Sequence, residues 1–346
     1  MQILDYRLLK KAVSKIDKLI VDIYLSISNE KSVVICLCFH AVFENSADSK
    51  SGLILPQQGI TCDDYRLIFD HFLEQNYQFI SYSMLNGGLK PGGKYIYVTF
   101  DDGYFNNSKL AGILGEYKIP IHLFVITQNI LTGNRFWWDI MFNEGTKRRW
   151  SEKKISREIS YLKTRPTKET EAYITSLFGE ESHKPLSDLD RPYTMQELIN
   201  LEKCKRVTVG NHTNDHTGLE IVQMSEAMAK VEIAQETLGN YLGERPTSFA
   251  FPYGNFNDKL ILELSKNKMK HIFTLESGRN KLRRRSQSRE CNVWGRFCFE
   301  KNISVERQCK MFRAANVSLN VMTTRITNFV EKRQLRANHT RQRIAS

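Results

Sequence analysis

The sequence predicts a parallel α/β fold in which the strands form a barrel, and three observations lead to this prediction. Short apolar runs rich in β-branched residues alternate with helical patterns, which is typical of parallel strands joined by helices. Polar residues that suit chemistry follow directly after several of these strands. The length of 346 residues, with 41% hydrophobic and 25% charged residues, is sufficient for one barrel domain of a soluble protein.

The expected strands, in chain order, cover residues 33–39, 95–100, 121–126, 206–210, 247–251 and 271–274. Apolar residues at helical spacing predict helices over 63–76, 108–117 and 225–242. Residues 134–200 interrupt the alternation, because they are polar and mostly helical in pattern. We interpret them as a helical insertion that forms a cap or wall beside the site. The expected division is an amphipathic helix in 1–32, the barrel in 33–300, and a C-terminal helix with a basic tail in 301–346.

The chain is strongly basic, with a formal net charge of +12. Much of this charge lies in two stretches, 281–289 and 333–343. A solvated surface is the simpler interpretation, and the alternative is a surface for anionic membrane lipid or for a lipid-linked or diphosphate-linked sugar. Nucleic acid is not expected as a partner, because no nucleic-acid-binding motif accompanies the basic residues.

Cysteine usage and the N-terminal segment bear on the compartment. The seven cysteines are scattered and none forms a Cys-x-x-Cys pair, so neither a zinc knuckle nor a disulfide framework is expected. Reduced thiols fit a cytoplasmic protein. Charged residues among the apolar ones in 1–25 argue against a secretory signal. We therefore expect a cytoplasmic protein, either with its N-terminal helix packed on the core or with that helix bound peripherally at the inner face of the membrane.

Two histidines and two aspartates are the candidate metal ligands. His212 and His216 are four residues apart, a spacing that places two side chains on one face of a helical turn. Neutral imidazoles bind divalent transition metals, and a carboxylate commonly completes the set while positions stay open for water. Asp101 and Asp102 follow a predicted strand and point in different directions, so we expect one to bind the metal and the other to accept a proton.

Three segments, in this order, resemble the motifs of the polysaccharide deacetylases, the NodB-homology or carbohydrate esterase family. Residues 99–103 (Thr-Phe-Asp-Asp-Gly) are similar to the first motif, 212–216 (His-Thr-Asn-Asp-His) to the second, and 251–254 (Phe-Pro-Tyr-Gly) to the third. The similarity covers roughly residues 33–300. It implies a NodB-like fold, which is a distorted, incomplete (β/α) barrel of about seven parallel strands.

Two shorter segments add to this resemblance. Residues 38–42 (Cys-Phe-His-Ala-Val) are similar to an opening phrase common in bacterial members. Residues 137–139 (Trp-Trp-Asp) resemble a feature of the members that carry a helical insertion. The resemblance therefore implies the bacterial, insertion-bearing branch of the family.

The resemblance implies a role for each residue that matches the first two motifs. Asp101 would be the general base. Asp102, His212 and His216 would bind a divalent metal ion, with zinc preferred and cobalt or nickel as alternatives. A metal-activated water would then attack the acyl carbonyl.

The third motif and the insertion would contribute to the substrate site. The backbone N–H of Tyr253, between Pro252 and Gly254, would help bind the oxyanion of the tetrahedral intermediate. Trp138, from the insertion, would lie beside the substrate.

The sequence departs from the family pattern in two places. Many relatives have an arginine two residues before the proline of the third motif, where this chain has Ala250. Arg296 is expected to take its place and to hold Asp101, with Arg245 as the weaker candidate. The histidine that often serves as general acid near the end of the domain also has no clear match.

Four other histidines are weighed as the general acid. His40 could face the site from the end of the first strand, and the alternative is a structural histidine at the mouth of the barrel. His122 is expected in the core, His271 opens a strand, and His339 lies in the polar tail.

The function expected from these residues is hydrolysis of the N-acetyl group of a sugar in a surface polysaccharide, such as O-antigen or capsule, or in its nucleotide-linked or lipid-linked precursor. Removal of a formyl or O-acetyl group by the same chemistry is one alternative. A sugar-binding or complex-forming protein that has lost turnover is another, because the expected general acid is missing. A membrane scaffold is a third.

Overall fold

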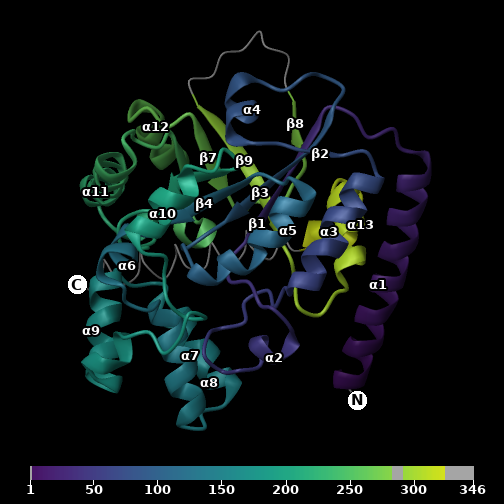
Figure 1. The fold of residues 1–346 in the computed structure, drawn as a ribbon. Coiled ribbons are helices and arrows are strands. Elements are labelled where there is room, and N and C mark those ends of the chain that lie inside the picture. Colours follow the sequence, from purple (N-terminus) through teal and green to yellow (C-terminus); the bar gives the residue numbers. More distant parts are fainter. Residues whose placement is uncertain (1, 283–290, 324–346) are drawn as a thin grey trace.

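Seven parallel strands form a closed ring in the computed structural model, which describes residues 2–282 and 291–323 (Figure 1). Neighbours around the ring follow the order β3, β4, β5, β6, β7, β9 and β1, and β1 pairs with β3 to close it. The short β2 pairs with β3, and β8 runs antiparallel to β1. The strands are β1 (Val33–Phe39), β2 (Gln78–Phe79), β3 (Lys94–Phe100), β4 (Ile121–Val125), β5 (Val207–Asn211), β6 (Ser248–Ala250), β7 (His271–Thr274), β8 (Asn280–Lys281) and β9 (Asn292–Cys298).

Helices surround the ring, and a group of them projects from one side of it (Figure 1). The helices are α1 (Gln2–Ile27), α2 (Ser46–Ser49), α3 (Cys62–Glu74), α4 (Tyr82–Gly87), α5 (Ala111–Tyr117), α6 (Thr127–Thr132), α7 (Trp137–Lys147), α8 (Glu152–Leu162), α9 (Thr167–Phe178), α10 (Met195–Glu202), α11 (Met224–Leu242), α12 (Asp258–Lys266) and α13 (Val305–Arg313). Short 3₁₀ segments are η1 (Phe105–Leu110), η2 (Glu180–His183), η3 (Leu219–Ile221) and η4 (Pro252–Gly254).

Strands β1, β3 and β4 are mostly apolar because both of their faces are buried. In β1, Val34 and Cys36 belong to a cluster with Tyr97, Phe124 and Phe273 from other strands of the ring. The alternate residues of β1 belong instead to a separate cluster that includes side chains of α3, α13 and the opposite faces of the strands. Alternate side chains therefore fill the barrel interior and the layer between strands and helices.

The expected α/β barrel with about seven parallel strands is confirmed, and six of its strands lie where the sequence predicts them. The sequence analysis missed β9, which pairs with both β7 and β1 and so joins the two ends of the ring. Its pattern was obscured because Asn292, Gly295 and Arg296 interrupt the apolar run. The helix expected over 108–117 is α5, preceded by the 3₁₀ segment η1.

The helical insertion lies between β4 and β5 and contains α7, α8, α9 and α10. In Figure 1, α7, α8 and α9 gather beyond one end of the barrel, near α6 and α2. Trp137 and Trp138 are buried in a cluster that joins this insertion to Tyr104 and Ile126, which follow β3 and β4. The insertion is thus packed against the loops at the carboxyl ends of these strands.

The N-terminal helix α1 packs against α13, at the edge of the molecule in Figure 1. Buried Asp17 accepts hydrogen bonds from Arg307 and Ser318, which holds the two helices together. The opposite face of α1 exposes Ile16 and Ile23. Within the described ranges, no helix has the length and apolar character needed to cross a membrane. Most of the basic residues of 281–289, and all of those in 333–343, lie outside the described residues.

Candidate metal centre and active site

The site lies where the strands of the barrel end. Asp101 and Asp102 directly follow β3, and His212 directly follows β5. Tyr253 comes three residues after β6, while Arg296 lies within β9. Because carboxyl ends of parallel barrel strands lie on one face, residues distant in sequence meet there. The structure brings all five of these residues to that face.

Three buried side chains, Asp102, His212 and His216, form one group of ligand atoms. Oδ1 of Asp102 lies 3.5 Å from Nε2 of His212 and 3.4 Å from Nε2 of His216. Two ligand atoms that are each about 2.1 Å from a tetrahedral metal ion lie about 3.4 Å apart. Oδ1 of Asp102 is buried and accepts no hydrogen bond from the described residues. The spacing and this unpartnered oxygen therefore fit a divalent metal ion.

The orientation of His212 also suits metal binding. Its Nδ1 lies 2.8 Å from the carbonyl oxygen of Ala250, so Nδ1–H donates to the backbone and Nε2 carries the free lone pair. That lone pair is on the side of Asp102 and His216. Burial, His212 and Lys163 hold the pKa of His216 well below its usual value, which keeps this imidazole neutral. Neutral imidazole is the form that binds a metal.

The interpretation of His212 and His216 as two positions of a helical turn is wrong. The segment between β5 and η3 is an irregular loop, and Thr213 and His216 have φ angles of 67° and 62°. Asn211 fixes the loop, because its side-chain oxygen accepts a hydrogen bond from Thr213 N–H at 2.8 Å. Two left-handed residues thus turn the chain back so that both imidazoles face Asp102.

Positive φ angles recur at other residues of the site. Asp102 has a φ of 75° and Tyr253 a φ of 56°. Left-handed backbone at residues other than glycine costs about 1–3 kcal/mol each and is found most often at functional sites. The surrounding structure holds these residues in a conformation that places their side chains in the site.

Asp101, which follows β3, is held by an arginine from β9, two strands away around the ring. The Arg296 guanidinium, which is completely buried, donates to Oδ1 at 2.6 Å and to Oδ2 at 2.7 Å. Burial opposes ionisation of Asp101, but Arg296 and His212 outweigh it and hold the pKa of this carboxyl at about 2. Asp101 is therefore a carboxylate with a fixed orientation.

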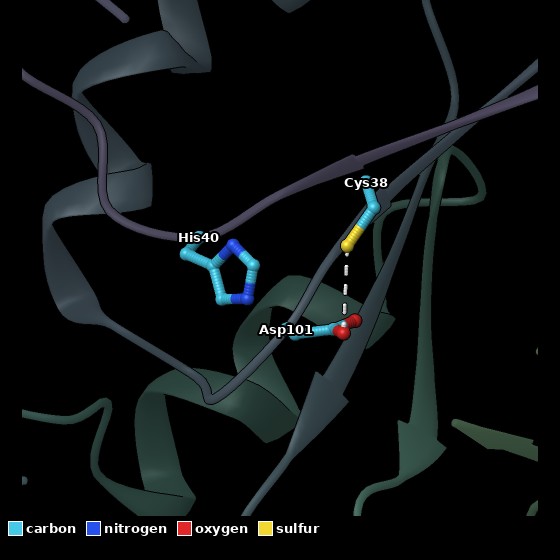
Figure 2. A group of neighbouring side chains, drawn as sticks. All are labelled: Cys38, His40 and Asp101. Atoms are coloured by element: carbon cyan, nitrogen blue, oxygen red, sulfur yellow. Dashed lines mark hydrogen bonds between the residues drawn. The ribbon is translucent and has the colours of Figure 1, made fainter. Parts of the chain in front are cut away.

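Cys38 and His40 form a second group of ligand-type atoms with Asp101. Figure 2 shows the Cys38 thiol directed at the Asp101 carboxylate, with the His40 ring beside it. The Cys38 thiol lies 3.5 Å from Oδ2 of Asp101. Burial raises the pKa of Cys38 well above its usual value, which keeps the thiol protonated. This group differs from the first because Arg296 already binds both oxygens of its carboxylate.

His40 is half-buried at the end of β1. Its Nδ1 lies 3.4 Å from the side-chain oxygen of Gln58, and its carbonyl accepts a hydrogen bond from Asn107. Gln58 is itself fixed, because its amide nitrogen donates to the Cys38 carbonyl at 2.7 Å. The ring is thus held at the rim of the site by Gln58, which the Cys38 carbonyl fixes in turn.

The other candidates from the sequence analysis lie elsewhere. His122 is in the barrel interior, where its ring nitrogens contact Tyr97 and Ser248. The ring of His271 accepts a hydrogen bond from the Trp294 indole. Arg245 forms ion pairs with Glu232 and Glu236 at the surface and not with Asp101. His339 lies outside the described residues.

The insertion forms one wall beside Asp102, His212 and His216, which we call the metal group. The Trp138 ring lies 4.8 Å from the His216 ring, and the Tyr253 ring lies 4.5 Å from it on another side. The Trp138 indole donates to the Tyr104 hydroxyl at 2.7 Å, and this hydroxyl donates to Asp139 at 2.6 Å. These contacts connect the insertion to the loop that carries Asp102.

Sequence reasoning missed Tyr104 and Lys163, although both lie at this wall. Tyr104 is completely buried and stands two residues after Asp102. Its place directly after the Asp-Asp-Gly segment was the available signal. Nothing in the sequence distinguished Lys163 from the other lysines of the insertion.

Comparison with known proteins places the chain in a family. Residues 88–272, more than half of the chain, match the model of the polysaccharide deacetylase family. The chain belongs to the polysaccharide deacetylase family. A search of curated protein sequences finds no match.

Solved deacetylase structures share the fold. The Streptococcus pyogenes deacetylase PplD in complex with acetate has 16% identity and a TM-score of 0.53, with 82% of this chain and 99% of that chain covered. A Bacillus cereus polysaccharide deacetylase has 15% identity and a TM-score of 0.55, with 82% and 69% covered. An Aggregatibacter actinomycetemcomitans de-N-acetylase has 15% identity and a TM-score of 0.54, with 80% and 99% covered. At this identity, the similarity shows a common fold.

Proposed function

We propose that this protein is a metal-dependent hydrolase that removes an N-acetyl group from a sugar of a surface polysaccharide or of its precursor. One observation carries the proposal. The unpartnered Oδ1 of Asp102 faces two imidazole nitrogens, directly beside a carboxylate that Arg296 holds ionised. A metal group next to a fixed base is what hydrolysis of an unreactive amide requires.

Asp102, His212 and His216 would hold the metal ion, which supplies polarisation of the acyl carbonyl and acidification of a water molecule. Two imidazoles and one carboxylate suit zinc, and they also suit cobalt or nickel. These side chains contribute by their fixed positions: the Ala250 carbonyl orients His212, and Trp138 and Tyr253 flank His216. Their apolar rings limit the access of bulk water.

Asp101 would accept the proton of the attacking water. Oδ1 keeps an acceptor position for it, because Oδ1 accepts only from Arg296, whereas Oδ2 accepts from Arg296 and from the Cys38 thiol. A carboxyl with a pKa of about 2 is a weak base, so Asp101 contributes mainly by orientation and depends on the acidity of the water. Arg296 is therefore a positioning residue for Asp101.

The remaining steps use the rim of the site. Tyr253 N–H, in the turn that Pro252 and Gly254 complete, would donate to the oxyanion. His40 would protonate the leaving amine. With Nδ1 directed at Gln58, its Nε2 is the nitrogen left for proton transfer.

The exposed apolar face of α1 and the net charge of +12 support a position at the inner face of an anionic membrane. A cytoplasmic enzyme in this place would meet lipid-linked or nucleotide-linked sugars. Co-sedimentation with vesicles that contain anionic lipid tests this part. The expected result is binding that salt weakens and that Ile23→Glu abolishes, and equal binding by the variant would contradict it.

The activity is tested by acetate release from a panel of N-acetylated nucleotide sugars and oligosaccharides. Chelated protein and protein reloaded with zinc, cobalt or nickel are compared, and metal analysis is made on the same samples. We expect release that returns with the metal. If the protein releases only formate or O-linked acetate, the proposed N-acetyl substrate is wrong and the acyl group is the one released. A protein that holds one metal ion per chain and releases no acyl group would support the sugar-binding alternative.

A further inference from the structure

Lys163 extends from the insertion toward the metal group. It caps the C-terminal end of α8, and its backbone N–H still donates to carbonyls of the last helical turn. Its Nζ lies 5.3 Å from the centre of the Tyr253 ring, within the range of a cation–π contact. The same Tyr253 ring lies 4.5 Å from the ring of His216. The ammonium group and a candidate metal ligand thus lie near the same aromatic ring.

This ammonium group has no acidic partner. Some other basic residues of the insertion form ion pairs with nearby glutamates, such as Lys147 with Glu144 and Arg165 with Glu169. No carboxylate of the described residues lies within ion-pair distance of Lys163. Lys163 is exposed as a residue, although the surrounding protein lowers the pKa of its ammonium and Asp102 partly opposes this effect. An accessible ammonium without an acidic partner, close to the metal ligands, is open to an anion from outside the chain.

The charge of the proposed metal site points in the same direction. Asp101 and Arg296 neutralise one another, and a divalent ion beside Asp102 leaves one positive charge. The ammonium of Lys163 adds a second. These two positive charges repel each other, and an anion bound at the mouth would interact favourably with both. A neutral N-acetylated sugar would use neither charge in this way.

We propose that Lys163 is a specificity residue that binds an anionic group of the substrate, a carboxylate or a phosphate, next to the N-acetylated sugar. The inference rests on the proposed deacetylase function and deepens it, because it names the substrate class as acidic glycans or phosphate-linked sugars. The insertion thereby selects the substrate, while the barrel supplies the hydrolytic groups.

The test measures binding separately from turnover. Metal-loaded protein carrying Asp101→Asn is titrated by calorimetry with three probes: a neutral chitin oligosaccharide, a heparosan oligosaccharide that carries carboxylates, and UDP-N-acetylglucosamine that carries a diphosphate. We expect one anionic probe to bind more tightly than the neutral one. Lys163→Met should remove this preference, with a loss of about 10- to 100-fold in affinity for that probe and little change for the neutral one. Lys163→Arg should retain most of it.

Lys154→Met is the matched control. Lys154 lies on the same helix and its Nζ is 3.5 Å from the centre of the Trp150 ring, so it makes the same kind of contact away from the metal group. This variant should keep the anionic preference. A purely structural Lys163 would change stability without changing the preference for charged over neutral probes.

The outcomes separate the two proposals. Equal binding of charged and neutral probes, no binding of either anionic probe, or an anionic preference that persists in Lys163→Met would overturn the role of Lys163. Anionic preference that depends on Lys163, in a protein whose parent chain releases no acetate, would retain the binding site and reject the deacetylase function. The anionic probe that binds more tightly identifies whether the anion is a carboxylate or a phosphate.

Discussion

Two groups of ligand-type side chains meet at the carboxyl end of β3, and they differ in what already holds their oxygens. Asp102 stands with His212 and His216 and has a buried oxygen without a hydrogen-bond partner. Asp101 stands with Cys38 and His40, but Arg296 binds both of its oxygens. Residue types alone would allow a metal in either group. The difference favours the Asp102 group as the metal site, because Arg296 already occupies both oxygens of Asp101.

The largest effect is expected from a substitution within the metal group. His212→Ala removes one of the two proposed imidazole ligands, so we expect loss of bound metal and of acetate release, with the fold retained. Metal analysis after gel filtration and circular dichroism measure the two properties. Cys38→Ala is the matched control from the other group and should retain one metal ion per chain. Full metal content in His212→Ala, or loss of metal in Cys38→Ala, would reverse the comparison.

Asp101→Asn should separate the two groups by their roles. The amide cannot accept the proton, so we expect the rate to fall by about 10²- to 10⁴-fold. The metal content should not change, because Asp101 is outside the metal group. Single-turnover acetate release and metal analysis on the same preparation check both statements, and an unimpaired rate would remove Asp101 as the base.

Arg296→Gln tests what holds the Asp101 group together. Removing one partner of a buried ion pair costs about 3–5 kcal/mol in the free energy of unfolding, because the other charge stays buried. The pKa of Asp101 should rise from about 2, since burial then acts without the guanidinium. In the parent protein, this carboxylate contributes stability above about pH 4, and the contribution disappears as the pH falls toward 2.

The variant should therefore lose activity at a higher pH than the parent on the acid side of the kcat/KM profile. Arg296→Lys, which keeps the charge but not the two parallel hydrogen bonds, should fall between them. An acid limb that does not move in either variant would contradict the positioning role.

A smaller effect is expected behind the metal group, at Asp139. Burial raises the pKa of this carboxyl to about 8 although Tyr104 and the Leu55 N–H donate to it, so it holds a proton at neutral pH. The unfolded chain releases that proton near pH 4, and the folded protein then binds more protons, so its stability falls as pH rises from 4 to 8. The loss between pH 5 and 7 is up to about 3 kcal/mol.

Asp139→Asn has no proton to release and should flatten this part of the stability curve. Urea unfolding of chelated protein at several pH values measures the slope. A slope equal to that of the parent protein would show that Asp139 is ionised in the folded state. A flattened curve would sharpen the comparison, because two buried carboxyls of one site would have pKa values shifted in opposite directions, that of Asp101 downward and that of Asp139 upward.

The sequence was sufficient for six of the seven strands of the ring and for the polar residues that follow several of them. Strand ends followed by Asp101, His212 and Tyr253 could be recognised because apolar runs and polar residues alternate clearly there. Strand β9 could not, since a buried arginine inside a strand looks like a surface residue until its partner is known. The predicted helical turn for His212 and His216 failed for a related reason. Residue spacing does not reveal the positive φ angles of Thr213 and His216.

The contributions of the insertion were hardest to predict. Its helical character follows from composition, but the contacts of Tyr104 and Lys163 depend on how it packs against the barrel loops. The domain boundaries, the general acid His40 and the membrane position stay predictions.

The pairing of Asp101 with Arg296 joins positions 195 residues apart, and this separation has a consequence for the order of folding during synthesis. Strand β9 emerges from the ribosome after the other six strands of the ring. Until it docks, the ring is open between β7 and β1, and Asp101 has no counterion. A nascent chain that ends before β9 would therefore be left with an exposed strand edge and an uncompensated carboxylate. Closure of the barrel and completion of the site therefore occur together, late in the folding of the newly synthesised chain.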